Sequence, residues 1–198
     1  MSESKHLRLV LEVVAEEVHE PELVATQPLA SFDAFAAGHR VHGWVRLDAD
    51  RLTDMLNAHT VLQLVNVLVE DLATGATVTA DEAIVHRDEL VAVRASGPRG
   101  DPARRQPTVG HPLLVDAGPY LVGGYLHAPQ GTDPLARVRA GEPMIPLTDA
   151  WIAFGSRDGV TRRRLGTVIV NRHLVTRFRA VTEAELEAAA LPVAVVAA

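Results

Sequence analysis

The sequence has no cysteine and a single lysine, Lys5, among its 198 residues. A chain without cysteine forms no disulfides and offers no thiolate metal ligand, no cysteine-bound iron–sulfur cluster and no cysteine nucleophile. With one lysine it has almost no candidate for Schiff-base chemistry. These two absences exclude much of redox and covalent catalytic chemistry.

Long apolar runs and a targeting pattern are also missing. No stretch of about 18 apolar residues occurs, and residues 1–5 lack the charged-then-apolar pattern of a signal peptide. We therefore expect a soluble, cytoplasmic protein without a membrane span.

Basic charge and aromatic residues are both scarce. The 19 Lys and Arg residues against 25 Asp and Glu residues give a formal net charge of −6, which argues against nucleic-acid binding by bulk charge. Aromatic residues make up 4% of the chain, too few for an evident base-stacking platform. The apolar share of 47% is typical of a globular chain, which at this length forms one domain or two small ones.

An internal repeat organises the chain. The matching segments are 41–45 with 122–126, 62–66 with 145–149, and 83–95 with 168–180. The offset between the partners grows from 81 through 83 to 85, as small insertions in a second copy would produce. The sequence therefore predicts two copies of one unit, over residues 41–95 and 122–180.

Each copy has the pattern of a small β unit. Val41–Leu47 alternates apolar and polar residues as a half-buried strand does, and Asp50 is the expected N-cap of a short helix. In the second copy Asp133 is the cap and Pro134 the first helical residue. Apolar strands and a closing hairpin over residues 84–94 follow. We predict a mainly β fold, with two tandem SH3-like or Sm-like small barrels and short helices.

Residues 1–40 are expected to be a separate lead-in segment. Ser31 as cap, Phe32 and Phe35 on one face and Gly38 as stop predict a short helix there. The apolar spacing of residues 7–18 fits either a strand or a helix.

The remaining two segments differ in composition. Residues 96–121 are rich in proline and glycine, which predicts a linker between the copies. In residues 181–198, Thr182 and Glu185 form the pattern of a capping box for a short helix, and an apolar tail follows.

Two motifs carry a resemblance to a known domain. Arg51–Asn57 fits the pattern R-L-[ST]-D-x-L-N, and Met144–Ala150 is followed by Val168–Arg172, a strand that ends in V-N-R. The chain resembles an uncharacterised bacterial domain with this signature, present in two tandem copies. The resemblance covers both repeats, but neither the first 40 residues nor the linker, and it implies no activity.

A looser resemblance is to Sm-like proteins, in which the last two strands of a five-stranded barrel flank a short turn with an arginine. Ile84–Asp88 is similar to that turn. The resemblance implies RNA binding, but the glycine that normally follows the arginine is absent from this sequence.

No catalytic, cofactor-binding or metal-binding residue is predicted. The nine histidines are scattered, and no H-E-x-x-H or G-x-S-x-G pattern occurs. His39 and His42 lie three apart on an expected strand, which directs their side chains to opposite faces.

Arginine clusters are the best polar candidates for a binding site. Arg104 and Arg105 lie in the expected linker, and Arg162, Arg163 and Arg164 lie beside an expected turn. Both clusters are candidates to bind an acidic partner or another anion, with solvated surface arginines as the alternative.

The C-terminal tail is the candidate assembly element. Its apolar residues Leu191, Val193, Val195 and Val196 favour extended structure, and an exposed apolar strand is something that soluble proteins avoid. We expect the tail to cover an edge of its own barrels or to add a strand to a neighbouring subunit.

These observations favour a non-enzymatic structural or protein-interaction subunit, an assembly or accessory protein in a homo-oligomer or larger complex, with no cofactor. One alternative is an Sm-like RNA-binding protein. Another is a small-molecule-binding protein or enzyme with a site between the barrels.

Overall fold

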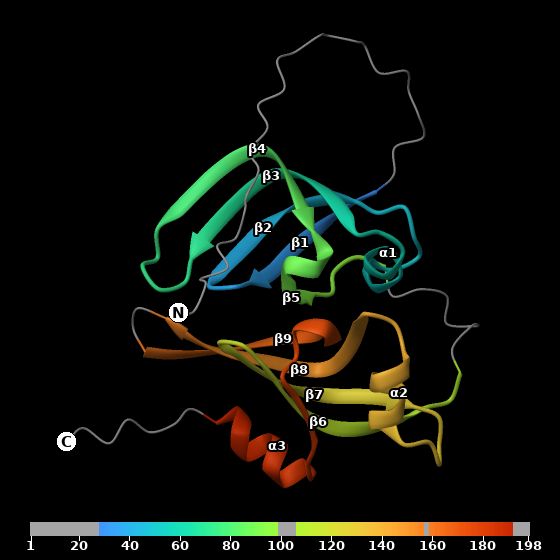
Figure 1. Cartoon of the computed structure of the whole chain (residues 1–198). Helices are drawn as coiled ribbons and strands as arrows, with labels where there is room; N and C mark the ends of the chain where they lie inside the picture. Colours follow the sequence, from blue (N-terminus) through green and yellow to red (C-terminus); the bar gives the residue numbers. More distant parts are fainter. Residues whose placement is uncertain (1–27, 99–105, 157–158, 192–198) are drawn as a thin grey trace, which may run out of the picture.

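In the residues that the computed structural model describes, 28–98, 106–156 and 159–191, ten antiparallel strands form one open sheet (Figure 1). The strands are β1 (Leu29–Ala36), β2 (His39–Arg46), β3 (Val61–Asp71), β4 (Thr77–His86), β5 (Leu90–Arg94), β6 (Val109–Ala117), β7 (Tyr120–Ala128), β8 (Met144–Ser156), β9 (Gly159–Asn171) and β10 (Arg177–Ala180). The helices are α1 (Leu52–Ala58), α2 (Pro134–Ala140) and α3 (Glu183–Ala190), with 3₁₀ turns η1 (Arg87–Glu89) and η3 (Arg172–Leu174). The prediction of a mainly β fold with short helices is confirmed.

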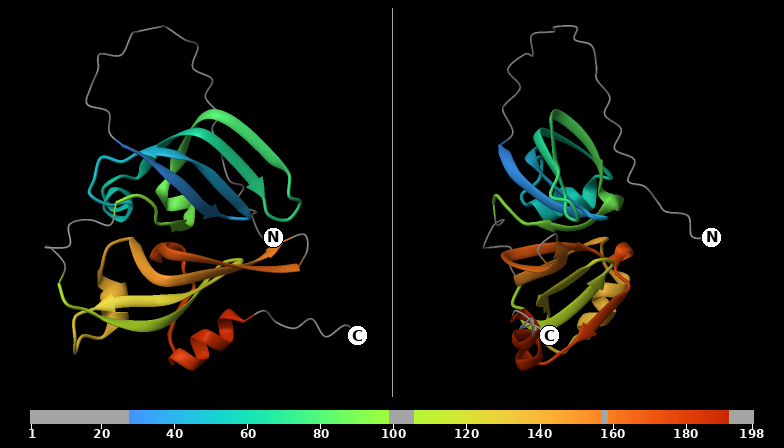
Figure 2. Two further views of the ribbon diagram at one scale, coloured as in Figure 1. Left: turned by 180° about the vertical axis from the view of Figure 1, so that it is seen from behind. Right: turned by 90° about the vertical axis from the view of Figure 1, so that its left-hand side faces the viewer.

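The two halves of the chain share one order of elements. Each runs strand, strand, helix, strand, strand, 3₁₀ turn, strand. The strand order is β5-β1-β2-β3-β4 in the first half and β10-β6-β7-β8-β9 in the second, and pairing of β5 with β9 joins them. Figure 2 shows the halves stacked on each other, each with a strongly curved sheet. A shared order is what the internal repeat predicts.

The strand registers also repeat. Phe32 pairs with Gly43 in the first half, and Leu113 pairs with Gly124 in the second. Both members of the pair are therefore offset by 81, as 113 − 32 and 124 − 43. This is the offset of the first sequence match, and it extends the match to β1 and β6.

A β-bulge lies at the same place in both halves. Asn66 in β3 and Asp149 in β8 have positive φ, 51° and 47°, and are the non-glycine residues that do so in the described part of the chain. Each lies where the register shifts against the preceding strand. Their offset, 149 − 66 = 83, is that of the middle sequence match.

The expected helices form, with one difference. Asp133 caps α2 by accepting from the backbone N–H of Leu135, and α3 has the expected capping box between Thr182 and Glu185. The prediction that Asp50 caps α1 is wrong: Arg51 occupies the N-cap position and no side chain caps the helix. The Arg51 guanidinium instead pairs with a carboxylate one turn along.

The predicted helix over residues 31–38 is wrong, because this segment is strand β1. Phe32 and Phe35 are both fully buried, but they belong to the cores of different halves. Residues three apart on a strand point to opposite faces. Because both faces of β1 are covered, apolar residues occur on both faces, and two of them three positions apart resemble the apolar face of a helix.

The linker prediction for 96–121 is also wrong over much of its length. β6 occupies Val109–Ala117, and β7 begins at Tyr120. Pro112 fits into β6 because it lies just outside the stretch that pairs with β10, which starts at Leu113. Each unit therefore begins one strand earlier than the predicted boundaries at 41 and 122.

The strands of the predicted closing hairpin exist, but they do not pair with each other. η1 turns the chain between β4 and β5, and β5 then pairs with β1 and β9. Within the described residues no strand ladder closes either half into a barrel, so the sheet is open.

Each half has its own apolar core, and the cores share residues across the junction. Met144 and Ile169 of the second half belong to the core of the first. Phe35 and Ala92 of the first half belong to the core of the second. A third, smaller cluster forms where α3 covers the outer face of the second half.

The sequence-based expectations for residues 7–18, for Arg104 and Arg105 and for the tail after Leu191 lie outside the described residues. None of the described helices is long and apolar enough to span a bilayer.

Candidate functional site

The structure does not gather the predicted arginines at one site. Arg162 and Arg164 lie on one face of β9, opposite Ala153 and Trp151, whereas Arg163 lies on the other face. Arg162 donates to the backbone carbonyl of Leu191. The Arg163 guanidinium lies 5.9 Å from the ring centre of Phe154. Arg104 and Arg105 lie outside the described residues.

The arginine of each 3₁₀ turn binds the end of the neighbouring helix. Arg87 lies 3.5 Å from the carbonyl oxygen of Leu56 in α1 and also pairs with Asp88. Arg172 donates to the carbonyl oxygens of Val138 and Arg139 in α2, at 3.1 and 2.6 Å. These carbonyls lack intrahelical partners, and a guanidinium satisfies them. The turn arginine of the Sm-like resemblance therefore has a structural partner in both halves.

No group of three or more His, Asp or Glu side chains in the described residues is placed to hold a metal ion. His42 lies 3.5 Å from the buried Asp33, which also accepts two hydrogen bonds of 2.9 Å from Arg40. Burial lowers the pKa of His42, opposed by the negative charge of Asp33. This cluster forms a structural ion pair near the contact between the halves.

Strands β5 and β9 form the junction between the two halves. In β5 and β9, Ala92 pairs with Val170 and Val93 pairs with Ile169, and all four side chains are fully buried. The side chains on one side of this ladder enter the first core, and those on the other side enter the second. The β5–β9 ladder is thus an apolar seam, with buried side chains on both of its faces.

Polar contacts fix the position of this seam. The side chain of Asn57 at the end of α1 accepts from the backbone N–H of Met144 at 2.9 Å and donates to its carbonyl at 3.1 Å. Asn171 donates to the carbonyl of Arg87 at 3.2 Å. Asn57 thereby pairs with the start of β8 as another strand would.

Aromatic rings fill the other end of the contact. Phe35, Tyr120 and Phe154 have ring centres 5.6 to 6.1 Å apart, and the Tyr120 hydroxyl donates to the carbonyl of Ala36. Burial raises the pKa of Tyr120 well above its ordinary value. The halves are therefore joined by aromatic contacts in addition to the ladder and the asparagine hydrogen bonds.

The outer edge of the first half is strand β4, which is the counterpart of β9. β9 pairs with β5 at the junction, whereas no described strand pairs with the outer side of β4. The last sequence offset is 85, and the registers place Val85 of β4 where Val170 lies in β9, and Ile84 where Ile169 lies. Ile169 is 0% exposed, because the first half covers it, whereas Ile84 is 46% exposed. On the adjoining strand, Met144 is 1% exposed and its counterpart Val61 is 48% exposed.

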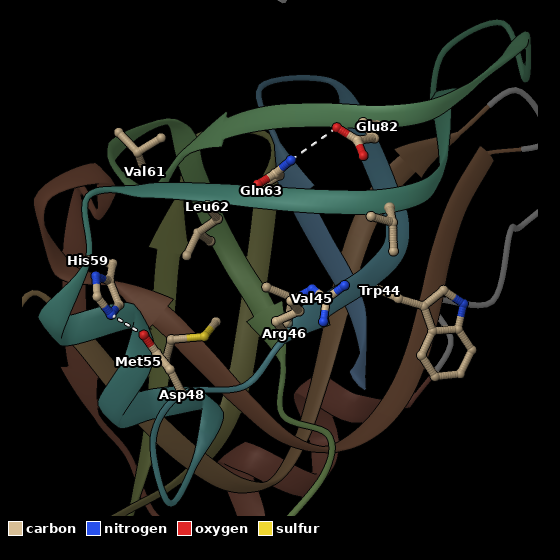
Figure 3. Close-up of a pocket in the computed structure, with 11 residues that line it drawn as sticks. Trp44, Val45, Arg46, Asp48, Met55, His59, Val61, Leu62, Gln63 and Glu82 are labelled. Atoms are coloured by element: carbon tan, nitrogen blue, oxygen red, sulfur yellow. Dashed lines mark hydrogen bonds and ion pairs between the residues drawn. The ribbon is translucent and has the colours of Figure 1, made fainter. Parts of the chain in front are cut away.

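A cavity of about 430 Å³ lies beside this edge, on the outer face of the first half rather than between the halves (Figure 3). Figure 3 shows residues of β2, β3, β4 and α1 around it. At one end of the cavity the Nε2 atom of His59 lies 2.8 Å from a carboxylate oxygen of Asp48, and Trp44 lies at the other end. Arg46 extends between them, with no hydrogen-bonding or ionic partner in the described part of the chain.

The outer faces of the two halves differ in their cover. Tyr125 corresponds to Trp44 at the offset of 81, and it is half-buried in the cluster beneath α3. Trp44 is 45% exposed, because no described helix covers the first half in the way α3 covers the second.

Asn57, Ile84 and Val61 are the site residues that sequence reasoning missed. The signal was present in the repeat, because Ile84 aligns with Ile169 at the recognised offset. What the sequence lacks is the information that β5 pairs with β9. Without that pairing, nothing distinguishes an exposed edge from a buried one.

Comparison of the chain with protein-family models, with curated proteins and with solved structures found no match.

Proposed function

We propose that this chain is a non-enzymatic assembly subunit. It is built from two copies of a small, barrel-like unit, and its β4 edge receives a strand from a neighbouring protein. One observation carries the proposal: the β4 edge has the apolar residues of the chain's own junction, but no strand covers them in the described residues.

The composition of β4 supports a docking edge. Edge strands are usually short, charged or interrupted by proline, which prevents unwanted pairing. β4 has ten residues and no proline, and its exposed side chains include Val78 and Ile84 as well as Asp81 and Glu82. An edge of this length with exposed β-branched residues is suited to strand addition.

The junction shows what such an addition contributes. β5 buries its apolar side chains between two cores when it pairs with β9. Full burial of one aliphatic side chain contributes about 1.5–3 kcal/mol. Covering Ile84 and Val61 in the same way gives a favourable free energy of association before the loss of translational freedom is counted.

The test measures self-association with light scattering and sedimentation, over a range of concentrations, for the full chain and two variants. We expect a concentration-dependent oligomer, and we expect Ile84→Lys to weaken its association by at least about tenfold. Val160→Lys is the matched control, because Val160 is 69% exposed at the far turn between β8 and β9. A chain that stays monomeric, or an oligomer that both variants leave unchanged, contradicts the proposal.

The cavity supports a second candidate function, the binding of a small ligand with an apolar part and an anionic group. Trp44 offers an exposed ring and Arg46 a charge without a described partner. A ligand there changes the emission of Trp44, and in a Trp151→Phe chain that residue is the sole tryptophan. Screening carboxylates and phosphates by this emission, with Arg46→Gln as the control, tests the candidate.

A further inference from the structure

The β4 edge has a defined template for its partner strand, because β9 pairs with β5 in the same chain. The template is the Val-Ala-Val segment Val91–Val93, of which Ala92 lies opposite Val170 and Val93 lies opposite Ile169. The corresponding partners on β4 are Val85 and Ile84. A strand that fits β4 in this way needs a small residue opposite Val85, between two closely packed surfaces, and an apolar residue opposite Ile84.

Strand β10 is the counterpart of β5, but it does not meet this requirement. At the offset of 85, Arg177 takes the place of Ala92, and Phe178 that of Val93. A guanidinium at the position of a fully buried alanine has a high desolvation penalty and no space. Charged residues on an edge strand also oppose pairing. In β10 the charge of Arg177 falls inside the segment that would pair, whereas the exposed charges of β4, Asp81 and Glu82, lie outside residues 84 and 85.

The C-terminal tail meets the requirement. Residues Val193-Ala194-Val195 repeat the Val91-Ala92-Val93 segment of β5 residue for residue, and Val196 follows where β5 has Arg94. Residues 191–198 have no charged side chain, and the β-branched residues among them favour extended pairing. The sequence therefore repeats three central residues of the junction strand just beyond α3.

We propose that residues 193–195 of one molecule pair antiparallel with β4 of a second copy of the chain. The register is that of β5 on β9, with Ala194 opposite Val85 and Val195 opposite Ile84. This inference rests on the proposed function, and it names both the strand and the partner.

The partner is a second copy because the tail is too short to reach β4 of its own molecule. α3 packs on the outer face of β6 and β7, and β4 is the far edge of the other half (Figure 1). Ala194 is three positions beyond Leu191, and a fully extended chain covers about 3.3–3.6 Å per residue. A tail on one end and a receiving edge on the other form a heterologous contact, which builds rings or open chains.

Disulfide trapping tests the register directly, since the natural chain has no cysteine. Directly paired residues of antiparallel strands have Cα atoms about 4.5–5.5 Å apart, within the range that a disulfide spans. We mix the Ile84→Cys and Val195→Cys chains under mild oxidation and expect the mixed dimer to exceed either homodimer. The Ile84→Cys and Phe178→Cys mixture is the matched control, which tests β10 as the strand.

Two further variants test the fit without a cross-link. Ala194→Arg places in the tail the residue that β10 has, and we expect it to weaken self-association by at least about tenfold. Ala198→Arg adds the same charge outside the paired segment, and we expect no change.

The outcomes separate this inference from the proposed function. Two results would show that the tail is not the added strand, while leaving the β4 edge as the docking site. One is a dominant cross-link between positions 84 and 178, and the other is association that depends on Ile84 but is unchanged by deletion of 192–198. If a chain with both Ile84→Cys and Val195→Cys forms only an intramolecular disulfide, the tail pairs within its own molecule and not with a second copy. Failure of every Ile84 variant to affect association overturns both.

Discussion

One amide side chain pairs with the backbone across the contact between the two halves. Asn57 at the end of α1 makes both hydrogen bonds of a strand partner with the backbone of Met144. Its counterpart in the second half, at the offset of 83, is Ala140, which has no side-chain hydrogen-bonding group. The asparagine of the helix motif is therefore present in the half whose helix meets a strand of the other half, and its counterpart in the second half cannot make these bonds.

We expect Asn57→Ala to lower the free energy of unfolding by about 1–3 kcal/mol, because it leaves a half-buried N–H and C=O of the backbone unpaired. Urea unfolding followed by circular dichroism measures the change. Gln63→Ala is the control, since it removes an exposed hydrogen bond to Glu82, and its effect is expected within about 0.5 kcal/mol. Equal effects of the two variants contradict this role for Asn57.

The pKa of His42 gives stability a predicted dependence on pH. Burial lowers this pKa from 6.5, helped by Arg40 and Arg163 and opposed by Asp33 and Glu70. The unfolded chain therefore binds more protons than the folded chain just below pH 6.5, and the free energy of unfolding falls as the pH is lowered through this window. Comparison with His42→Asn across pH 5–8 isolates the effect: the stability difference between the two chains is expected to shift in favour of the variant at low pH. A pH-independent difference contradicts it.

At the scale of elements, one glycine in β7 leaves space for a tryptophan ring that packs in the cluster beneath α3. A Cβ atom on Gly123 would lie 2.4 Å from the ring of Trp151, which is part of the cluster beneath α3. We expect Gly123→Ala to lower the free energy of unfolding by about 1–3 kcal/mol through displacement of this ring.

Gly155→Ala in the neighbouring strand is the matched control, because a Cβ atom there meets nothing within 4 Å. Thermal unfolding of both variants, read by Trp151 emission in a Trp44→Phe chain, compares them. A Gly123→Ala chain as stable as the Gly155→Ala chain is the result that contradicts the close contact.

The elements that the sequence predicted have local signals, although the local cap signal at Asp50 was misleading. The cap at Asp133, the capping box of α3 and the turn between β4 and β5 each depend on a few neighbouring residues. β1 was mistaken for a helix because cores lie on both of its faces, which hides the alternation that identifies a strand. β6 was mistaken for a linker because its proline lies where no ladder partner needs an N–H group.

At the scale of the whole molecule, the repeat was visible in the sequence and the single sheet was not. Offsets of 81 and 85 are a property of the residues, and the registers reproduce them. The pairing of β5 with β9 joins segments about 75 residues apart, as the separation of Val93 from Ile169 shows. Nothing in the periodicity of either segment specifies such a non-local partner. The same gap hid the open β4 edge, because an edge is defined by what does not pair with it.

The shared cores make the two halves one cooperative unit. Because side chains of each half complete the core of the other, neither half keeps its packing when the other unfolds. We expect one unfolding transition in urea, with the same midpoint by circular dichroism and by Trp151 emission in a Trp44→Phe chain. Two resolved transitions contradict the shared core.

The most direct test of the central claim, that β4 is a docking edge, is hydrogen–deuterium exchange of the intact chain at several protein concentrations. Amides of residues 77–86 that point away from β3 have no ladder partner among the described residues of the same molecule. The account predicts that they exchange fast in dilute protein and become protected as concentration rises, while the buried β5 and β9 amides stay protected throughout. Exchange along β4 that is independent of concentration would contradict it.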